Sequence, residues 1–210
     1  MTLQNGMIHG GKVYLWTDTM VLDGDTCEVI GVMPKAFYGL HHPFAGSVSN
    51  VGTPFQSLMQ AIGHGKTTTE DELLRTAQLA LMDYCADGST ARLLLGCCYT
   101  EPRLYYVAGD NLLGVPFAAY SVTHYLNPQH ENNSDPVTFA QMPSKIADQV
   151  TGKFMPVGPL GALGKRQTVG GTIVQIEVSR NGVTERELVL PGKAGRALRR
   201  SMAGVEARAA

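Results

Sequence analysis

Residues 10–21 read GGKVYLWTDTMV, in which β-branched and aromatic side chains stand between a glycine pair and the polar triplet 17–19. Such a run favours an extended strand, and the polar triplet predicts where that strand ends. A turn signal follows at 22–25, and residues 26–32, TCEVIGV, are expected to return as the second strand of a hairpin. The beginning of the chain is therefore predicted to be antiparallel β-structure.

Beyond this hairpin, strands and helices come in blocks. Pro54 stands at a first helical position, Thr69 to Glu72 form a capping box, and Asn181-Gly182 is a hairpin signal. Blocks of this kind predict an α+β fold with antiparallel sheets rather than alternating βαβ units. In chain order we expect strands at 12–16, 26–32 and 34–39, helices at 54–62 and 69–84, strands at 91–99 and 103–108, helices at 116–126 and 136–150, and strands at 172–178 and 183–190.

The composition is that of a globular protein. The 210 residues include 17 Lys and Arg against 18 Asp and Glu, a net charge of −1, and 44% are hydrophobic. This excludes a disordered polyelectrolyte and argues against a general nucleic-acid binder, which would carry a basic excess. No stretch approaches the ~20 apolar residues that span a bilayer, and the amino end lacks the regions of a signal peptide. We expect a cytoplasmic protein that contacts neither membrane nor nucleic acid.

No metal or cofactor site is expected. The cysteines at positions 27, 85, 97 and 98 lack metal-ligand spacing and are interpreted as reduced thiols. His41-His42 has no Cys, Asp or Glu at a supporting distance in the sequence. The string GHGKT at 63–67 imitates the end of a P-loop, but Gln60 replaces the opening glycine and a helix precedes it, so nucleotide binding is rejected.

Four strings occur in a fixed order along most of the chain: GGKVYLWTDTMV at 10–21, PKAF at 34–37, FAGSVSNVGTPFQSLMQAI at 44–62 and TVGGTIVQIEVSRNGVTEREL at 168–188. Together they resemble the proteasome β-subunit family of N-terminal nucleophile (Ntn) hydrolases, including its bacterial two-ring peptidase relatives. The resemblance implies a four-layer αββα sandwich, two antiparallel sheets flanked by helices, as a single domain over residues 1–192. Residues 193–210 are expected to form a basic, Ala/Arg-rich C-terminal tail, helical or loose.

The resemblance also implies a catalytic site at the amino end. The family nucleophile matches Thr2, which becomes the first residue once Met1 is removed, a routine reaction before a small residue. Asp18 follows Thr2 by 16 positions, the separation that the family shows, and Lys35 follows Asp18 by 17, one more than in the family. These three residues are the expected catalytic group.

Further residues are carried over from the same family. Gly46 and Ser47 match the turn whose backbone N–H groups form the oxyanion hole, and Thr168 and Gly170 are the candidates for supporting roles. The sequence departs from the family where a supporting Asp and Ser are replaced by Arg166 and Val169. A third supporting residue, a Ser expected near position 115, is also missing.

The chemistry of these residue types is coherent. A threonine hydroxyl needs a base, and a free α-amine, with a pKa of about 7.7–8.0, can take its proton. Lys35 beside Thr2 would lower the pKa of that amine through like-charge repulsion, while Asp18 would hold Lys35 in place. Backbone N–H groups would stabilise the tetrahedral oxyanion. The reaction would be amide hydrolysis through an ester on Thr2.

Three hypotheses about function follow. The first is a threonine-type peptidase or amidase that acts on peptides or proteins inside a self-compartmentalised, homo-oligomeric ring, for which the family implies an unfolding ATPase partner. The second is a catalytically inactive structural or assembly subunit with the same fold. The third is an Ntn amidase that acts on a small molecule. The mass of the intact protein distinguishes the first two, because only a chain without Met1 has the required amine on Thr2.

Overall fold

The computed structural model describes residues 2–23, 28–49, 55–110, 114–128, 137–152 and 169–209, with side chains described up to residue 203. Cys27, the predicted first turn of a helix at 52–54, Arg166 and the candidate supporting residue Thr168 lie outside the described residues.

Strands dominate the described part of the chain, and four α-helices accompany them. The strands are β1 (Gln4–His9), β2 (Lys12–Asp18), β3 (Met20–Leu22), β4 (Val29–Val32), β5 (Ala36–Tyr38), β6 (Phe44–Ser49), β7 (Arg92–Cys97), β8 (Arg103–Ala108), β9 (Ala119–Val122), β10 (His124–Tyr125), β11 (Ile173–Ser179) and β12 (Gly182–Glu187). The helices are α1 (Gln56–Gly63), α2 (Glu70–Tyr84), α3 (Met142–Thr151) and α4 (Gly192–Ala209), and a 3-10 turn η2 (Phe139–Gln141) precedes α3.

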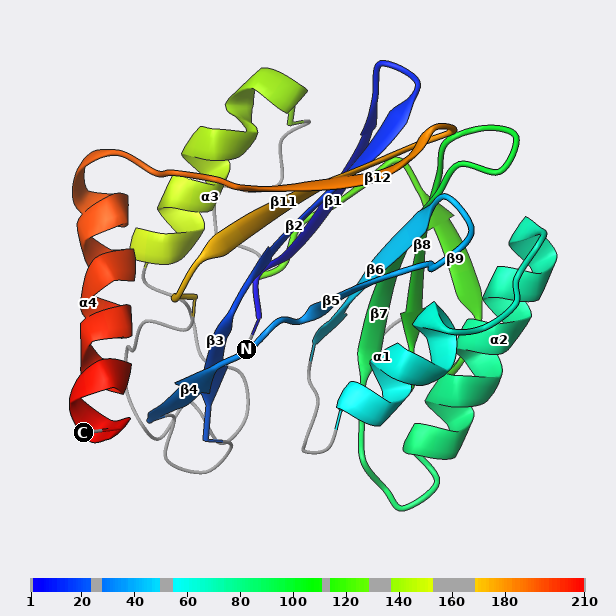
Figure 1. Cartoon of the computed structure of the whole chain (residues 1–210), viewed down its shortest axis with the longest axis horizontal. Helices are drawn as coiled ribbons and strands as arrows, with labels where there is room; N and C mark the ends of the chain where they lie inside the picture. The colour runs from blue at the N-terminus through cyan, green and yellow to red at the C-terminus, as the bar shows by residue number, and fades with distance from the viewer. Residues whose placement is uncertain are drawn as a thin grey trace.

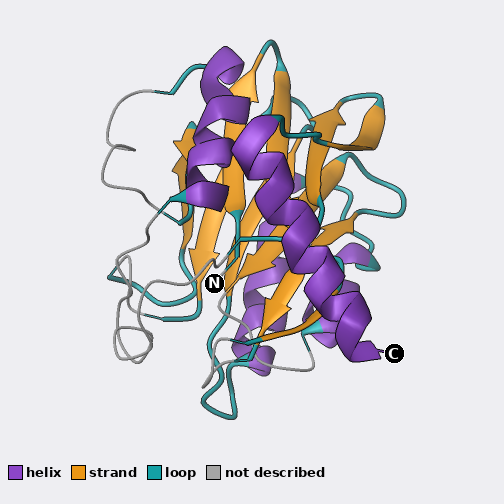
Figure 2. Ribbon diagram, turned by 90° about the vertical axis from the view of Figure 1, so that its left-hand side faces the viewer, coloured by secondary structure: helices purple, strands orange, loops and turns teal. Residues whose placement is uncertain are grey.

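The strands form two five-stranded sheets and a separate pair, all antiparallel. One sheet has the order β10-β1-β2-β11-β12, the other the order β5-β6-β7-β8-β9, and β3 pairs with β4 alone. Figure 1 shows α3 and α4 on one side of the molecule and α1 and α2 on the other. Seen from the side, α3 and α4 lie across the strands of the first sheet (Figure 2). The chain is thus a mixed α/β protein with antiparallel sheets, as expected.

The strand at 12–16 lies in the middle of the first sheet, but its expected partner is wrong. It pairs with β1 and β11, whereas the segment expected to return beside it supplies β4, which pairs with β3. The reason is the glycine pair before it. Gly10 and Gly11 have φ of 57° and 74° and form a two-residue turn between His9 and Lys12. A turn with two positive φ values matches the twist of a tight hairpin, so β2 pairs with the preceding residues.

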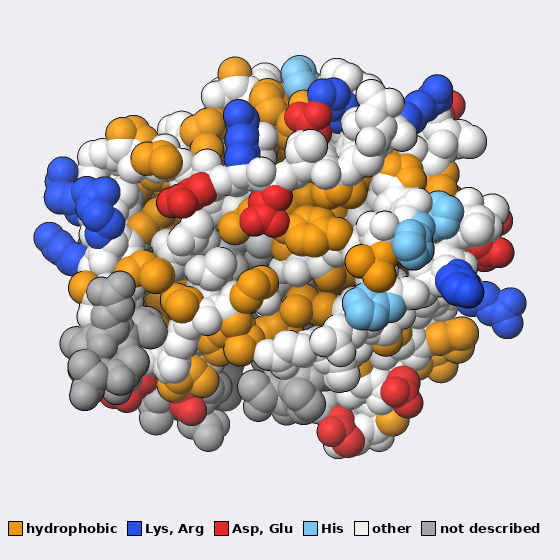
Figure 3. All heavy atoms as spheres, viewed as in Figure 1, with side chains coloured by type: hydrophobic (Ala, Val, Ile, Leu, Met, Phe, Trp, Pro, Cys, Tyr) orange, Lys and Arg blue, Asp and Glu red, His pale blue; other side chains and the backbone are white. Residues whose placement is uncertain are grey.

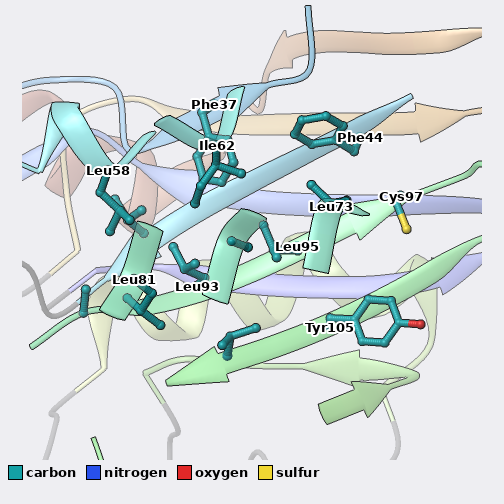
Figure 4. Close-up of a cluster of buried hydrophobic side chains, with 14 of the residues drawn as sticks. Phe37, Phe44, Leu58, Ile62, Leu73, Leu81, Leu93, Leu95, Cys97 and Tyr105 are labelled. Carbon is teal, nitrogen blue, oxygen red and sulfur yellow. The ribbon is translucent and has the colours of Figure 1, made fainter. Parts of the chain in front are cut away.

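Three hydrophobic clusters connect the sheets and the helices. Side chains alternate along each strand, so the two faces of one strand contribute to different clusters. The cluster between the sheets contains Val13, Leu15, Leu94, Leu104, Tyr106 and Ile176. The cluster beneath α1 and α2, drawn in Figure 4, contains Phe37, Phe44, Leu58, Ile62, Leu73, Leu81 and Leu95. The cluster beneath α3 and α4 contains Trp16, Met142, Ile146, Ile173, Ala194 and Leu198.

Two local predictions have different outcomes. The capping box is confirmed: the Thr69 side chain accepts from the Glu72 N–H, and α2 begins at Glu70. The helix expected at 116–126 is wrong, because this segment forms β9 and β10. Strand β9 completes the second sheet by pairing with β8, and β10 pairs with β1 of the first sheet. Partners distant in the sequence decide its conformation, and the local pattern does not contain them.

The basic segment at the end of the chain is helical. Helix α4 buries Ala194 and Leu198 in the same cluster as α3, so its first turns are packed against the rest of the chain. Its exposed face carries Lys and Arg side chains, which gather over α4 in Figure 3. No helix within the described residues combines the length and the apolar character needed to span a bilayer.

Two glycines allow the sheets to approach closely. A Cβ added at Gly6 would lie 2.9 Å from Leu94 Cδ2, and one added at Gly96 would lie 2.7 Å from Val13 Cγ1. Both contacts join one sheet to the other. Extra atoms in a closely packed core force backbone shifts, so these two positions favour glycine.

We therefore expect Gly96→Ala to lower the free energy of unfolding by about 1–3 kcal/mol, because the new methyl group collides with Val13. Gly31→Ala is the matched control, since a Cβ at Gly31 in β4 would have no atom within 4 Å. Urea unfolding of both variants measures the difference. Equal stabilities for the two variants would contradict the close approach of the sheets.

Candidate active site

The Asp18 carboxylate joins three segments that are distant in the sequence. It lies at the end of β2 with an exposed fraction of 0%. Its Oδ1 accepts from the Lys35 ammonium at 2.9 Å and from the Leu3 N–H at 2.9 Å, and its Oδ2 accepts from the Gly170 N–H at 3.1 Å. The start of β1, the segment before β5 and the Gly-Gly turn before β11 therefore meet at one side chain.

These contacts explain how a charge is tolerated there. Removal of a carboxylate and an ammonium from water costs several kcal/mol per ion, and close pairing with further hydrogen bonds offsets that cost. The Lys35 side chain is 5% exposed, and its charge faces the carboxylate directly. Charge-assisted bonds from two backbone N–H groups add to this pairing. The pair is a fixed element of the interior rather than a flexible surface contact.

Thr2 lies beside the Asp18–Lys35 pair because it is covalently linked to Leu3, which binds Asp18. It directly precedes Leu3, whose N–H is bound to Asp18, and consecutive Cα atoms are about 3.8 Å apart. Thr2 is buried, with an exposed fraction of 5%, and its carbonyl oxygen accepts from the Asn127 side-chain amide at 3.0 Å. The sequence-predicted residues Thr2, Asp18 and Lys35 thus share one region of the molecule.

Lys35 is held in place by its backbone as well as by its charge. It lies between β4 and β5, and its carbonyl oxygen accepts from the Val48 N–H of β6 at 2.9 Å. This bond extends the β5–β6 pairing by one step. Because β6 is a central strand of the second sheet, it anchors the backbone from which Lys35 reaches Asp18 in the first sheet.

The predicted oxyanion residues Gly46 and Ser47 lie inside the second sheet. Gly46 is paired with Phe37 of β5 and with Leu95 of β7. The pairs two residues away on either side of Phe37–Gly46 are hydrogen-bonded: the Val48 N–H donates to the Lys35 carbonyl, and the Gly39 N–H donates to the Phe44 carbonyl. Because hydrogen-bonded pairs alternate along an antiparallel ladder, the Gly46 N–H points to the Phe37 carbonyl.

By the same alternation, the Ser47 N–H points to β7. An oxyanion role for Gly46 therefore requires β5 and β6 to separate at this pair. Packing also explains the glycine, because a Cβ there would lie 2.4 Å from the Phe37 ring. The Ser47 hydroxyl is buried and has no hydrogen-bond partner among the described residues.

The Gly-Gly turn lies against the end of β2. Besides the Gly170 N–H bond to Asp18, the Gly170 carbonyl accepts from the Met20 N–H at 3.2 Å. Gly171 has φ of 73°, and its N–H donates to the Ser201 hydroxyl at 2.9 Å. A Cβ at Gly170 would lie 2.5 Å from Met20 Sδ, so the close approach itself requires glycine. The sequence identified Gly170 as a supporting residue, and its backbone is the part in contact.

Sequence reasoning missed a set of side-chain amides near the amino end, of which Gln4, Asn5 and Gln149 are fully buried and Asn127 is half-buried. Polar residues at the start of β1 are the one local signal, since a strand that enters the core normally carries apolar side chains there. The partners of Gln4 in β6 lie 43 and 45 positions away and those of Asn5 lie 122 and 144 positions away, so the sequence does not identify them.

Other candidate sites do not gain support. Within the described ranges, no group of three or more His, Cys, Asp or Glu could hold a metal ion. Burial, with a smaller contribution from Glu70, raises the pKa of the Cys97 thiol to about 12, which makes it a poor nucleophile. A surface pocket of about 520 Å³ lies at the β5–β6 and β11–β12 turns, and His41, His42 and Arg180 are among its lining residues. The predicted catalytic residues are not part of that lining.

The buried pair provides a direct test of the site's geometry. Lys35→Met leaves the Asp18 carboxylate buried with backbone donors alone, so we expect the free energy of unfolding to fall by about 3–5 kcal/mol. Lys12→Met is the control, because Lys12 forms an ion pair with Glu177 while 41% of its side chain is exposed. Urea unfolding of the two variants should show a much larger loss for Lys35→Met. Comparable small losses would mean that the Asp18–Lys35 pair is not buried.

Comparison with known proteins supports the fold. No family model and no curated protein matches the sequence. Among solved structures, the chain is similar to Anbu from Hyphomicrobium sp. strain MC1, a bacterial proteasome-like protein determined as a Gly-1 mutant. The TM-score is 0.65, the identity is 13%, and the match covers 100% of this chain and 96% of that one. At this identity the likeness shows the fold alone, and the chain shares that fold with Anbu.

Proposed function

We propose that the chain is a threonine-type peptidase or amidase of the proteasome-like class, with Thr2 as its nucleophile once Met1 is removed. The observation that carries the proposal is the buried Asp18 carboxylate, which binds both Lys35 and the N–H of Leu3. One acidic side chain thereby links the lysine to the residue that follows the nucleophile. Thr2, Asp18 and Lys35 are the residue types that an Ntn-type site requires.

In this proposal the Thr2 hydroxyl attacks the carbonyl carbon of an amide substrate. Its proton passes to the free α-amine of Thr2 and from there to the departing amine of the substrate. An ester on Thr2 remains, and water hydrolyses it to release the acid and restore the hydroxyl. Lys35 keeps a positive charge beside the reacting groups, and Asp18 keeps Lys35 in place. Oxyanion stabilisation by Gly46 and Ser47 stays a prediction that needs the Phe37–Gly46 pair to open.

The proposal extends to the architecture and the assembly. Three hydrophobic clusters, one between the sheets and one beneath each pair of helices, support a four-layer αββα sandwich. The likeness to Anbu supports a proteasome-like assembly, and we propose a cytoplasmic, homo-oligomeric ring that takes peptide or protein substrates. An unfolding ATPase is the partner that such a ring would need for folded substrates.

Two observations favour the alternative of a catalytically inactive subunit with the same fold. Val169, where the family has a supporting hydroxyl, is fully buried in the apolar cluster beneath α3 and α4. The Gly46 N–H is directed into the sheet. An inactive subunit would keep the Asp18–Lys35 pair for stability alone.

Mass spectrometry and mutation separate these functions. We expect the intact protein to lack Met1 and to hydrolyse fluorogenic peptides, and Thr2→Ala to lower the turnover rate by at least ~10³-fold because the nucleophile is lost. Thr184→Ala is the control, since Thr184 is an exposed threonine on β12. A protein that uniformly retains Met1 and hydrolyses no peptide is the inactive subunit. Full activity in Thr2→Ala would identify a different nucleophile.

The assembly has its own test. Size-exclusion chromatography with light scattering should give a mass several times that of one chain, since a ring encloses the catalytic sites of its subunits. A monomer at all concentrations tested would contradict the ring and leave the catalytic proposal to be judged by the Thr2 variants.

A further inference from the structure

Strand β1 begins with two side-chain amides that point in opposite directions. Gln4 and Asn5 are both fully buried and, as neighbours in a strand, face opposite sides of the sheet. The Gln4 amide donates to the Ser47 carbonyl at 2.9 Å and accepts from the Ser49 hydroxyl at 2.8 Å, both in β6 of the other sheet. Asn5 faces α3, where it meets Gln149. The first residues of the chain are therefore held from both faces.

Asn127 makes three hydrogen bonds to this same short segment. Its side-chain Nδ2 donates to the Thr2 carbonyl at 3.0 Å, and its backbone N–H donates to Asn5 Oδ1 at 3.0 Å. Its carbonyl oxygen accepts from the Gln4 N–H at 2.8 Å. A single residue thus contacts positions 2, 4 and 5 of the chain. The bond to the Gln4 N–H continues the register in which Gly6 lies opposite Tyr125 of β10, whereas the bonds to the Thr2 carbonyl and to Asn5 Oδ1 are additional to the strand pairing.

Gln149 fixes the amide of Asn5 in turn. The Gln149 Nε2 donates to Asn5 Oδ1 and to the Pro128 carbonyl, each at 3.0 Å, and its Oε1 accepts from Asn5 Nδ2 at 2.6 Å. A carbonyl can accept only, and a backbone N–H can donate only, so Pro128 and Asn127 determine which way both amides are turned. Every polar atom of the two side chains has a partner. Such a fully satisfied buried network is rigid.

These bonds converge on one peptide group. The Thr2 carbonyl is bound by Asn127, and the Leu3 N–H of the same peptide group is bound by Asp18. Because a peptide group is planar, a bond at each of its ends fixes the plane and with it the Cα of Thr2. With the Cα of Thr2 fixed, the positions of its hydroxyl and its amine can change only by rotation about bonds within Thr2.

We propose that Asn5, Asn127 and Gln149 form an amide clamp that positions Thr2 for catalysis, with Asn127 as the residue in direct contact. The inference rests on the proposed function, since it assigns the clamp to the same site. Asn127 touches the carbonyl of Thr2, not its hydroxyl or amine, so it is a positioning residue. The clamp binds the carbonyl of the Thr2–Leu3 peptide group. Asp18 binds the N–H of the same peptide group and also binds Lys35.

The test is Asn127→Ala, with two measurements. Because misplacement of a reacting group by about 1 Å can cost ~10²-fold in rate, we expect kcat to fall by ~10- to 100-fold while KM changes less than about twofold. Hydrogen exchange at the Leu3 amide should become faster, since the Thr2–Leu3 peptide group loses its bond to the Asn127 side chain, whereas the Gln4 N–H keeps its bond to the backbone carbonyl of residue 127. Gln78→Ala is the matched control: the Gln78 side chain also donates to a backbone carbonyl, that of Phe117, at 2.9 Å, but from α2 on the other sheet. It should change neither kcat nor the exchange of Leu3.

The outcomes separate this inference from the proposed function. Unchanged kcat and unchanged exchange in Asn127→Ala would overturn the clamp even in an active enzyme. If the parent protein hydrolyses no peptide but the exchange of Leu3 still rises in Asn127→Ala, the clamp holds Thr2 and the proposed function fails. If Asn127→Ala does not fold, the unaltered protein decides. The Leu3 amide should then exchange at least ~10²-fold more slowly than that of Gly10 in the exposed β1–β2 turn, and equal rates would overturn the clamp.

Discussion

The structure depends on a carboxylate that is withdrawn from water. Asp18 ends the central strand of one sheet, and its two oxygens bind a lysine from the segment before β5, an N–H from the start of the chain and an N–H from the Gly-Gly turn. A buried carboxylate without these donors would be costly, so the four groups specify one another's positions. The proposed chemistry uses the same arrangement.

The two sheets supply the frame for this meeting. Asp18 belongs to the first sheet, whereas the backbone of Lys35 is bonded to β6 of the second, so the ion pair crosses from one sheet to the other. Gly6 and Gly96 let the sheets come close enough for such a contact. The amides of Gln4 and Asn5 extend the same principle, because they tie β1 to β6 on one face and to α3 on the other. Polar groups, and not only apolar packing, fix where the amino end lies.

The sequence predicted the features that are encoded locally. The capping box at Thr69 starts α2, and the Asn-Gly signal marks the β11–β12 turn, where Gly182 has φ of 122°. The sequence failed where partners are distant. Residues 116–126 form strands because β8 and β1 lie beside them, and the partner of the strand at 12–16 depended on the Gly10–Gly11 turn. For the site, spacing placed Thr2, Asp18 and Lys35 in one region, but Asn127 and Gln149 could not be found, since their partners are 122 to 144 positions away.

The central claim is that the amino end of the mature chain presents a reactive hydroxyl beside the Asp18–Lys35 pair. A crystal structure of the protein treated with a peptide boronate tests it most directly, because boron forms a reversible bond with a nucleophilic hydroxyl. The account predicts a bond from boron to Thr2 Oγ1, with Lys35 still paired to Asp18. A structure with that pair intact, Met1 attached and no boron on Thr2 would contradict it.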